Sequence, residues 1–574
     1  MHRNLTTRAD KRRAAVRGID PTASTNRVRP GLAASLRNWS QSTLGQAGIG
    51  AALFWAALPP LELWPLAWIA PIFWMRLVGR KELPGRRPYR AVWLAGFVFW
   101  LAALHWLRFP HWGTAMLGVL LALYLGSYLP LFIGLSRVAV HRWRVPVILA
   151  TPAIWGGLEL ARAHVLTGFS MGSLAHTQYR WLHVIQIADL GGEIAVGAVI
   201  IFAAACLGRM WPCDGQPRAL WPAVPLVLVL AGVLGYGHMR LSTGNSRAGP
   251  TIALIQGSID TQVKADSEQH HRVYEQYFGL SREAVERHPD VDLLVWPETM
   301  YRDPWLVMRE DLRPPPDTNY TPDEMRSAAD RSRWKLAHAI DMLPRRVPML
   351  LGVDVIEYGP GTVDHYNSAV LISRDAEVLG RYDKMHPVMF GEYVPLGRTF
   401  PWIYDFVPGL AAGLTPGART DAIFLGDLRM SINICYESVL SHLIRRQVSE
   451  MQSRGEEPNL LVNLTNDGWF YGSSELDMHL VCGVFRAVEC RKPLVIAANT
   501  GFSASIDANG AIHARGPRRD TGVVIADVLL DGRDSLYLRI GDWPWAVCLI
   551  GCILLMVHGL RQRFPARRVH RAGH

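Results

Sequence analysis

Apolar residues are concentrated in the first 240 positions of this chain and again close to its C-terminus. A helix that crosses a bilayer needs about 20 predominantly apolar residues. Stretches of roughly this length lie near 44–60, 61–78, 91–108, 114–136, 146–163, 187–208, 219–238 and 543–560. We therefore predict about eight membrane-spanning helices, seven of them in a domain over 44–240. The first two stretches are short and separated by Pro59-Pro60, so they could instead form one re-entrant hairpin.

Between residues 249 and 532 the pattern changes, and short apolar runs alternate with amphipathic stretches. Runs typical of strands lie at 251–256, 293–296, 349–355, 368–373, 378–382, 430–434, 460–464, 494–499 and 503–507, and helical periodicity appears at about 267–288, 323–342, 437–451 and 476–491. Nearly continuous apolar strands separated by amphipathic helices indicate a sheet that is covered by helices on at least one face. The pattern predicts an α/β domain over 249–532.

Two segments of this domain that read as loops, 302–322 and 394–420, are longer than the loops of a compact fold. They are candidates for lids over a site, or else surface insertions.

Charge indicates how the predicted spans are oriented. Lys and Arg cluster at 3–17, 80–87, 137–144 and 561–568, and the intervening loops carry almost none. The positive-inside rule places such clusters in the cytoplasm. We therefore expect a disordered cytoplasmic arm over 1–43 and a cytoplasmic tail over 561–574. Seven spans before 249–532 and one after it put that domain on the exoplasmic side, an alternation that merging the first two spans would break.

The same charge distribution argues against nucleic-acid binding. The net charge is +11, but residues 250–530 hold 28 Lys and Arg against 38 Asp and Glu, so the excess lies in the membrane portion. Basic residues that alternate with spans mark topology instead of forming one nucleic-acid-binding face.

The sequence gives no indication of a metal or a cofactor. The seven Cys and 20 His show no metal-ligand or disulfide spacing, and no glycine-rich phosphate loop is present. We therefore expect neither.

Three unlike reactive side chains each follow a strand-like run: Glu298, Lys384 and Cys435. The carboxyl ends of strands are where sites collect in α/β domains. In this combination Glu298 can act as a general base, Cys435 as the nucleophile that forms a thioester, and the Lys384 ammonium as the group that stabilises an oxyanion. Because Cys435 lies at a strand-to-helix turn, we also expect the helix N-terminus to favour its thiolate.

Two residues near this trio could support it. The backbone N–H of Tyr436 directly follows the nucleophile and is a candidate second oxyanion donor. Glu392, in Phe390-Gly391-Glu392, could position Lys384 or Glu298, or it could be an ordinary loop carboxylate.

These motifs resemble those of the carbon-nitrogen hydrolase (nitrilase) superfamily. With multiple spans before the domain and one after, residues 45–560 resemble the apolipoprotein N-acyltransferase family of bacterial inner membranes. The motifs that carry the resemblance are Trp296-Pro297-Glu298, Tyr382-Asp383-Lys384, Gly391-Glu392-Tyr393-Val394-Pro395, Cys435-Tyr436-Glu437, Asn466-Asp467-Gly468-Trp469-Phe470, Phe485-Arg486-Ala487-Val488-Glu489 and Asn499-Thr500-Gly501.

The resemblance implies an αββα sandwich that faces the periplasm, with Glu298, Lys384 and Cys435 as the catalytic triad and Glu392, Tyr436 and Glu437 as supporting residues. It also implies a phospholipid acyl donor and an acceptor that is the N-terminal S-diacylglyceryl cysteine of a lipoprotein. We expect a membrane-embedded monomer. One departure concerns the pocket: the family usually has Lys-Trp-Asp where this chain has Lys264-Ala265-Asp266, so a tryptophan expected to line the substrate site is missing.

The membrane portion argues for lipid substrates in its own right, because exposing an acyl chain to water costs about 0.8 kcal/mol per CH₂. Two alternatives stay open. The same triad could serve a membrane-anchored amidase that hydrolyses small exoplasmic amides, with water replacing the amine. The chain could also be a transporter-like or scaffold protein with an inactive domain, although Glu159 and Arg162 fit interfacial anchors better than a transport path.

Overall fold

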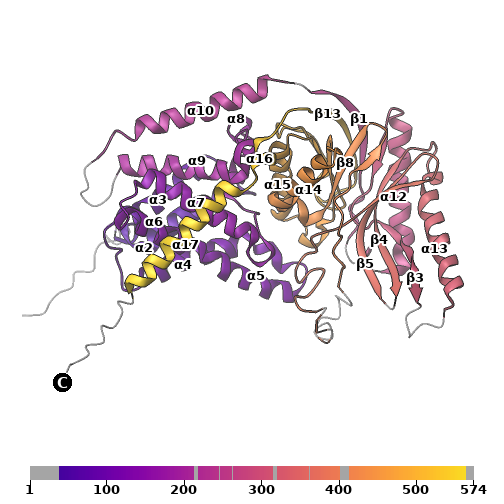
Figure 1. Ribbon diagram of the computed structural model, residues 1–574, viewed down its shortest axis with the longest axis horizontal. Coiled ribbons are helices and arrows are strands. Elements are labelled where there is room, and N and C mark those ends of the chain that lie inside the picture. Colours follow the sequence, from indigo (N-terminus) through magenta and orange to yellow (C-terminus); the bar gives the residue numbers. More distant parts are fainter. Residues whose placement is uncertain are drawn as a thin grey trace, which may run out of the picture.

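A computed structural model describes residues 38–563, apart from 212–217, 245, 261–262, 265, 314–319, 361, 398, 401 and 403–412. A helical region and an α/β region pack against each other, and the C-terminal helix returns from the second to the first (Figure 1). Most of the predicted arm and tail, 1–43 and 561–574, lies outside the described residues, and so does Ala265.

Each of the eight predicted apolar stretches contains a helix. These helices are α2 (Thr43–Ala57), α3 (Leu66–Gly79), α4 (Pro88–Ala103), α5 (Trp112–Gly126) with α6 (Tyr128–His141), α7 (Val147–His164), α9 (Ala188–Met210), α10 (Ala223–Ser242) and α17 (Trp543–Arg563). By length and composition, four segments of the described chain could cross a membrane: 112–141, 188–210, 223–242 and 543–561. The helices α3 and α4 are apolar but shorter.

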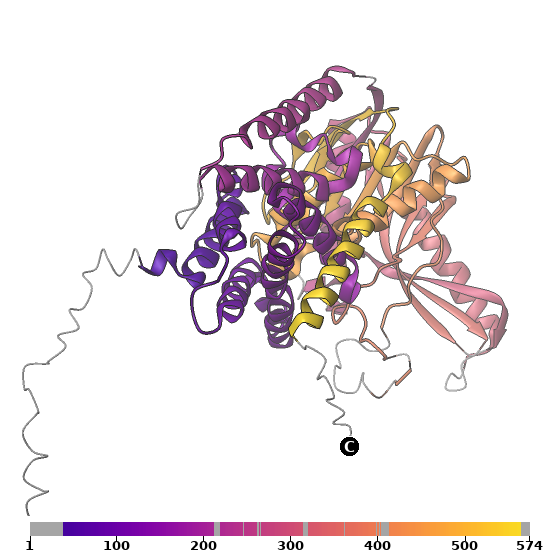
Figure 2. The ribbon, with the colours of Figure 1, turned by 60° about the vertical axis from the view of Figure 1, so that its left-hand side comes forward.

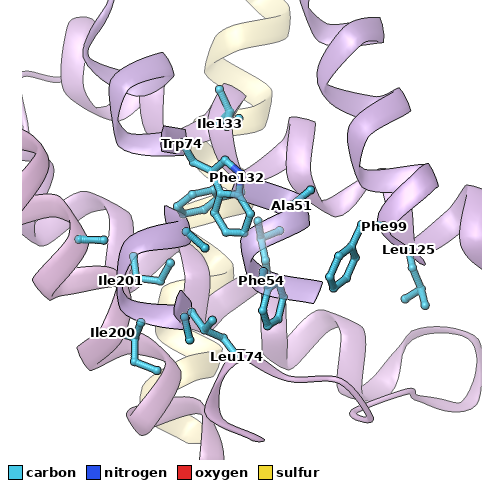
Figure 3. Packing of buried hydrophobic residues seen from close by; sticks show 14 of the residues in the cluster. Ala51, Phe54, Trp74, Phe99, Leu125, Phe132, Ile133, Leu174, Ile200 and Ile201 are labelled. Atoms are coloured by element: carbon cyan, nitrogen blue, oxygen red, sulfur yellow. The ribbon is translucent and has the colours of Figure 1, made fainter. Parts of the chain in front are cut away.

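Interlocking aromatic rings form the core of the helical region (Figure 3). Phe54 of α2 stacks on Phe99 of α4 with ring centroids 4.8 Å apart, and Trp74 of α3 stacks on Trp155 of α7 at 6.0 Å. Phe132 of α6 meets both tryptophans edge-on. Offset and edge-on pairs of this kind are the geometries that aromatic rings prefer. The helices α2, α3, α4, α6 and α7 therefore pack as one body.

The α/β region contains two sheets. The first has the strand order β13-β1-β2-β4-β5-β6, with β3 also paired to β4, and the second has the order β12-β11-β10-β9-β8-β7. Parallel pairing of β1, β2 and β4 in one sheet matches parallel pairing of β8, β9 and β10 in the other. The strands are β1 (Arg247–Gln256), β2 (Leu293–Val295), β3 (Tyr301–Arg313), β4 (Met349–Pro360), β5 (Val363–Ile372), β6 (Val378–Asp383), β7 (Ile423–Leu425), β8 (Leu428–Ile434), β9 (Leu460–Thr465), β10 (Leu494–Ala498), β11 (Ala504–Ile506), β12 (Ile512–Arg515) and β13 (Gly522–Leu530).

The two sheets pack face to face, and helices cover both outer faces. Ile252 and Val295 from the first sheet share one core with Ile432 and Val462 from the second. The helices α12 (His270–Arg287) and α13 (Pro322–Ala337) cover the first sheet, and α14 (Ser441–Ser453) and α15 (Glu475–Cys490) cover the second (Figure 1). This four-layer αββα sandwich is the predicted architecture.

The α14–α15 layer faces the helical region, so α15 is covered on both sides (Figure 2). All of its residues except Asp477 are buried. This placement brings the loop that precedes α14 against the membrane helices.

The structure corrects one of the predicted lids. Residues 302–322 do not form one long loop, because Tyr301–Arg313 is strand β3, which pairs in parallel with β4, and helix α13 begins at Pro322. The side chains of Trp305 and Val307 pack onto the core on the outer face of the first sheet. Much of the second predicted lid, 394–420, lies outside the described residues, and its last residues, 413–420, are neither helix nor strand.

Candidate active site

The three predicted reactive residues follow three strands of the sandwich. Glu298 lies three residues after the end of β2, Lys384 directly follows β6, and Cys435 directly follows β8. Glu298 and Lys384 are buried, and Cys435 is partly exposed.

Lys384 is the centre of a buried charge cluster. Its Nζ donates to Glu298 Oε1 at 3.2 Å and to Glu392 Oε1 at 2.7 Å. Burial opposes the charge on the amine, but the two carboxylates outweigh burial and raise the pKa of Lys384 well above its ordinary value. The side chain is therefore an ammonium at neutral pH. The structure thus brings Glu392 to Lys384, one of the two positions expected for it.

Glu298 is held from two sides. The same Oε1 accepts a hydrogen bond of 2.7 Å from Nδ2 of Asn367, a buried residue of β5. The following residue, Thr299, has a left-handed backbone with φ of 52°. Lys264 donates to the Thr299 hydroxyl and, at 3.4 Å, to the carbonyl oxygen of Glu298. Burial lowers the pKa of Lys264 to about 8.

Cys435 turns the chain sharply at the end of β8. Its φ is 52°, a left-handed conformation that a residue with a side chain adopts only when its surroundings impose it. Its carbonyl oxygen accepts from Ser438 Oγ at 3.1 Å and from Asn463 Nδ2 at 3.2 Å, and it lies 3.2 Å from His479 Nε2. The charges of Glu298 and Lys384 both act on the Cys435 thiol.

The expected thiolate is not favoured at this position. The element that begins at Cys435 is a 3₁₀ turn of five residues, Cys435–Val439, and not the start of an α-helix with a long dipole. Burial and the Glu298 carboxylate raise the pKa of the Cys435 thiol well above its ordinary value, and the Lys384 ammonium offsets only part of this effect. Cys435 therefore rests as a neutral thiol, and the Glu298 carboxylate that acts on it is a candidate acceptor for its proton.

Glu437 joins the 3₁₀ turn Cys435–Val439, called here the nucleophile turn, to residues 384–386, called here the lysine loop. Its Oε2 accepts from Ile434 N–H at 2.6 Å and from Tyr382 O–H at 2.9 Å, and its Oε1 accepts from the N–H groups of Met385 at 2.7 Å and His386 at 3.0 Å. Four donors converge on two oxygens, so the side chain serves as a carboxylate, although burial raises its pKa. Glu437 thereby fixes Cys435 relative to Lys384.

Tyr436 connects the site to the membrane helices. Its hydroxyl donates to the carbonyl oxygen of Gly168, in the loop after α7, at 2.8 Å. Nearby, Phe470 meets Trp106 edge-on with ring centroids 4.9 Å apart. Tyr436 and Phe470 pack against the same apolar core as the membrane helices. The nucleophile turn therefore faces the helical region.

Sequence reasoning missed four polar residues at this site. Asn367 donates a hydrogen bond to Glu298, and Lys264 donates one to Thr299. His479 faces the carbonyl oxygen of Cys435, and Asp467 faces the other ring nitrogen of His479. No sequence pattern distinguishes His479 from the other histidines, and Asp467 stands out only as part of the Asn466-Asp467-Gly468-Trp469-Phe470 motif. A buried asparagine inside the apolar run of β5 was the available signal for Asn367, since a polar side chain in a core needs a partner.

Asp467, Glu475 and His479 also form the only group of potential metal ligands in the part of the chain that the structure describes, with ligand atoms within 4.8 Å of one another. His479 Nδ1 lies 3.0 Å from Asp467 Oδ1, and Nε2 faces the Cys435 carbonyl and Ser438 Oγ. A carboxylate and a carbonyl both accept hydrogen bonds, so both ring nitrogens carry protons and neither offers a lone pair to a metal.

An αββα sandwich that places a glutamate and a lysine after two strands of one sheet, and a cysteine after a strand of the other, defines an enzyme of the carbon-nitrogen hydrolase class. Residues 251–536 match the family model for carbon-nitrogen hydrolases, and residues 50–206 match the model for the apolipoprotein N-acyltransferase N-terminal domain.

Comparison with curated proteins identifies the family. The chain is 34% identical to an apolipoprotein N-acyltransferase of Geobacter metallireducens over 524 residues, covering 88% of this chain and 93% of the relative. It is 29% identical to one from Rhodopirellula baltica, covering 86% and 93%. The chain belongs to the apolipoprotein N-acyltransferase family, and its apolar helices are those of a bacterial membrane protein.

Among solved structures, the chain is similar to the nitrilase-superfamily protein Nit3 of Saccharomyces cerevisiae, with 16% identity, a TM-score of 0.34 and coverage of 56% of this chain and 96% of that one. An amidase of Nesterenkonia matches with 18% identity, a TM-score of 0.34 and coverage of 52% and 96%.

Proposed function

We propose that this protein transfers a fatty acyl chain from a bilayer phospholipid, through a thioester on Cys435, to the N-terminal amine of an S-diacylglyceryl-cysteine lipoprotein. The observation that carries the proposal is the position of the nucleophile. Cys435 begins a turn whose next residue, Tyr436, bonds to the membrane-helix loop at Gly168. A nucleophile at that junction can react with the ester of a phospholipid while the acyl chain stays in the bilayer. A soluble amide substrate would not need the nucleophile to lie beside membrane helices.

In the first half-reaction Glu298 takes the Cys435 proton as sulfur attacks the ester carbon of the phospholipid. The Lys384 ammonium stabilises the oxyanion, with the Tyr436 N–H as the second donor. The ester C–O bond then breaks, and the departing alkoxide takes the proton back from Glu298. The products are a Cys435 thioester and a lysophospholipid.

In the second half-reaction the lipoprotein amine attacks the thioester carbon and gives a proton to Glu298. The C–S bond breaks, an amide forms, and the proton returns to sulfur. Glu392 holds Lys384, and Glu437 sets the lysine loop against the nucleophile turn, so neither reacts directly. One chain supplies every group, so a monomer suffices.

For the orientation we propose eight spans, with α5 and α6 together forming the fourth. Two of the basic clusters, 80–87 and 137–144, lie at one end of the helical region. Arg137 near the end of α6 donates to the carbonyl oxygens of Leu77, at the end of α3, and Lys81, and Trp143 packs against His558 of α17. The catalytic region contacts the opposite end, through the loop after α7. The positive-inside rule then places Cys435 in the periplasm and both termini in the cytoplasm.

A reporter enzyme that is active only after export tests this orientation. A fusion after residue 531 should be active, and a fusion after residue 561 should be inactive. The reverse pattern would refute the proposed topology.

The reaction is tested by incubating the full-length protein in vesicles with phospholipid that carries a labelled acyl chain. The wild type and Cys482→Ala, which alters a buried thiol on α15, should both gain one labelled acyl group, and Cys435→Ala should gain none. Addition of a diacylglyceryl-cysteine peptide should move the label to the peptide amine. Hydrolysis of soluble amides without peptide acylation would favour a membrane-anchored amidase instead.

A further inference from the structure

The peptide bond between Cys435 and Tyr436 is held by an unusual number of groups. Its carbonyl oxygen faces donors from three elements: Ser438 Oγ in the 3₁₀ turn at 3.1 Å, Asn463 Nδ2 on β9 at 3.2 Å, and His479 Nε2 on α15 at 3.2 Å. Ser438, Asn463 and His479 are all at least nine-tenths buried. None of them is needed for the proton transfers described above.

His479 is the charged member of this group. Its Nδ1 lies 3.0 Å from Asp467 Oδ1, and its Nε2 lies 2.9 Å from Ser438 Oγ as well as facing the carbonyl. The serine hydroxyl uses its own hydrogen to bond to the carbonyl, so it accepts from the imidazole. Burial opposes the charge on the ring, but Asp467 outweighs burial and raises the pKa of His479. The carbonyl therefore faces an imidazole whose charged form is favoured by Asp467.

The geometry of a trans peptide couples the position of the Cys435 carbonyl to that of the Tyr436 N–H. The C=O of Cys435 and the N–H of Tyr436 belong to one rigid plane and point in opposite directions. Donors that fix the carbonyl consequently fix the N–H. A cationic donor also polarises the peptide, which strengthens the N–H as a hydrogen-bond donor.

We propose that the Asp467–His479 pair, with Ser438 and Asn463, positions and polarises the Cys435–Tyr436 peptide so that the Tyr436 N–H stabilises the oxyanion of each tetrahedral intermediate. These are positioning residues, because they act on the far side of the peptide from the reacting atoms. The left-handed backbone of Cys435 fits this role, because such a conformation persists only where the surroundings impose it. The inference rests on the proposed acyl transfer.

Two reactions of the same thiol separate this role from simple structural support. Thioester formation passes through an oxyanion, whereas alkylation of Cys435 by iodoacetamide does not. In vesicles, His479→Leu should slow single-turnover acylation from labelled phospholipid on the order of 100-fold, the scale of a lost oxyanion donor. Alkylation should change far less.

Milder variants make the test independent of whether His479→Leu folds. His479→Gln keeps a neutral donor, so its acylation rate should lie between those of the wild type and His479→Leu, and Ser438→Ala should slow acylation about tenfold. His513→Gln is the matched control, because it makes the same substitution in another His–Asp pair with a 3.0 Å N–O distance, on the β11–β12 hairpin.

The outcomes are distinct. Wild-type protein that forms no thioester would refute the acyl transfer itself. A wild type that is acylated, with His479→Gln and Ser438→Ala acylated equally fast, would refute the positioning role. Equal losses of acylation and alkylation in these variants would also overturn it, because a general distortion of the turn would then explain both.

Discussion

At the scale of single residues, the groups around Cys435 keep its thiol protonated in the resting site. Two carboxylates hold Lys384 as an ammonium, and burial together with Glu298 keeps Cys435 as a thiol. On the periplasmic side that we propose for Cys435, where disulfides form readily, a resting thiolate would be exposed to oxidation. A neutral thiol beside its base avoids this exposure and still reacts when Glu298 takes the proton.

The raised pKa of Cys435 gives a prediction for Glu298→Gln. Alkylation by iodoacetamide follows the thiolate fraction, so the wild-type rate should still rise with pH beyond about 8.5, the ordinary value for a thiol. Removing the Glu298 charge lowers the pKa of Cys435 and moves this curve to lower pH. Each pKa unit changes the thiolate fraction at a fixed pH about tenfold. Glu298→Gln should thus be alkylated faster at pH 8 while losing thioester formation.

The measurement is the alkylation rate from pH 6 to 10, with Cys435→Ala as the blank for the other cysteines. Glu283→Gln, a change on the outer helix α12, should reproduce the wild-type curve. Slower alkylation of Glu298→Gln at every pH would mean that Glu298 does not raise the pKa of Cys435.

The sequence indicated where Glu298, Lys384 and Cys435 lie relative to the strands, but not the groups that hold them. Glu298, Lys384 and Cys435 each follow an apolar strand, a local pattern that a single sequence displays. Asn367 and His479 act on residues 69 and 44 positions away. Their roles depend on which strands and helices become neighbours, and strand order is not visible in local periodicity. The prediction that the thiolate of Cys435 is favoured was wrong for the same reason, since burial and the distant Glu298 carboxylate raise the pKa of this thiol.

At the scale of elements, a single side chain joins the two sheets at the site. Glu437 lies in the turn after β8 of the second sheet and accepts from Met385 and His386, which follow β6 of the first. The relative placement of Cys435 and Lys384 therefore depends on this carboxylate more than on either strand alone.

Replacement of Glu437 by Gln should test this connection. An amide nitrogen in place of one oxygen would point a donor at N–H or O–H donors, and buried groups left unpaired cost about 1–3 kcal/mol each. We expect a loss of unfolding free energy in that range and a slower acylation of Cys435. Thermal unfolding of the protein in detergent and single-turnover acylation would measure the two effects.

An exposed glutamate provides the control for this variant. Glu283 pairs with Arg287 on the surface of α12, and a pair of that kind contributes less than about 1 kcal/mol. Glu283→Gln should leave both measurements close to those of the wild type. If Glu437→Gln did the same, the connection between the sheets would not depend on this residue.

The strands that were predicted are more deeply buried than those that were missed. Strands β4, β5, β8, β9 and β10 are largely buried and read as apolar runs. In contrast, β13 lies at the edge of its sheet, and its Val524–Leu530 segment alternates buried with more exposed residues. The strand β3 contains Pro304 and several charges, which hid it within a segment that was predicted to be a loop. Edge strands tolerate such residues, so continuous hydrophobicity finds central strands first.

At the scale of the whole molecule, buried ion pairs connect the sandwich to the membrane helices. Arg491, which follows α15, pairs with Asp189 of α9 at 2.7 Å. One turn earlier, Arg486 pairs with Glu193 of α9 at 2.6 Å and with Glu489 of its own helix at 2.9 Å. These charges are almost fully buried. Each region therefore supplies counter-ions for the other, which predicts that the two unfold together.

Arg486 is the residue at which this coupling can be measured. Its guanidinium pairs with Glu193 and Glu489, and its Nη1 donates to the carbonyl oxygen of Val439 at 3.2 Å, at the end of the nucleophile turn. Arg486→Met would leave two buried carboxylates without their shared cation, and removal of one partner from a buried pair costs about 3–5 kcal/mol. We expect a single unfolding transition at a lower temperature and a slower acylation of Cys435.

Removing all three charges should be less harmful than removing the cation alone, because a buried neutral amide costs less than an uncompensated buried charge. The triple variant Arg486→Met, Glu193→Gln, Glu489→Gln should accordingly recover part of the stability that Arg486→Met loses. Arg287→Met removes the exposed pair with Glu283 and should change the unfolding free energy by less than about 1 kcal/mol. Two separate transitions in calorimetry, with Arg486→Met moving only one of them, would show that the sandwich and the membrane helices are stable independently of each other. The position of the Cys435–Val439 turn against the helical region would then have to be maintained by contacts such as those of Tyr436 and Phe470, because the buried charges would not be what holds the two regions together.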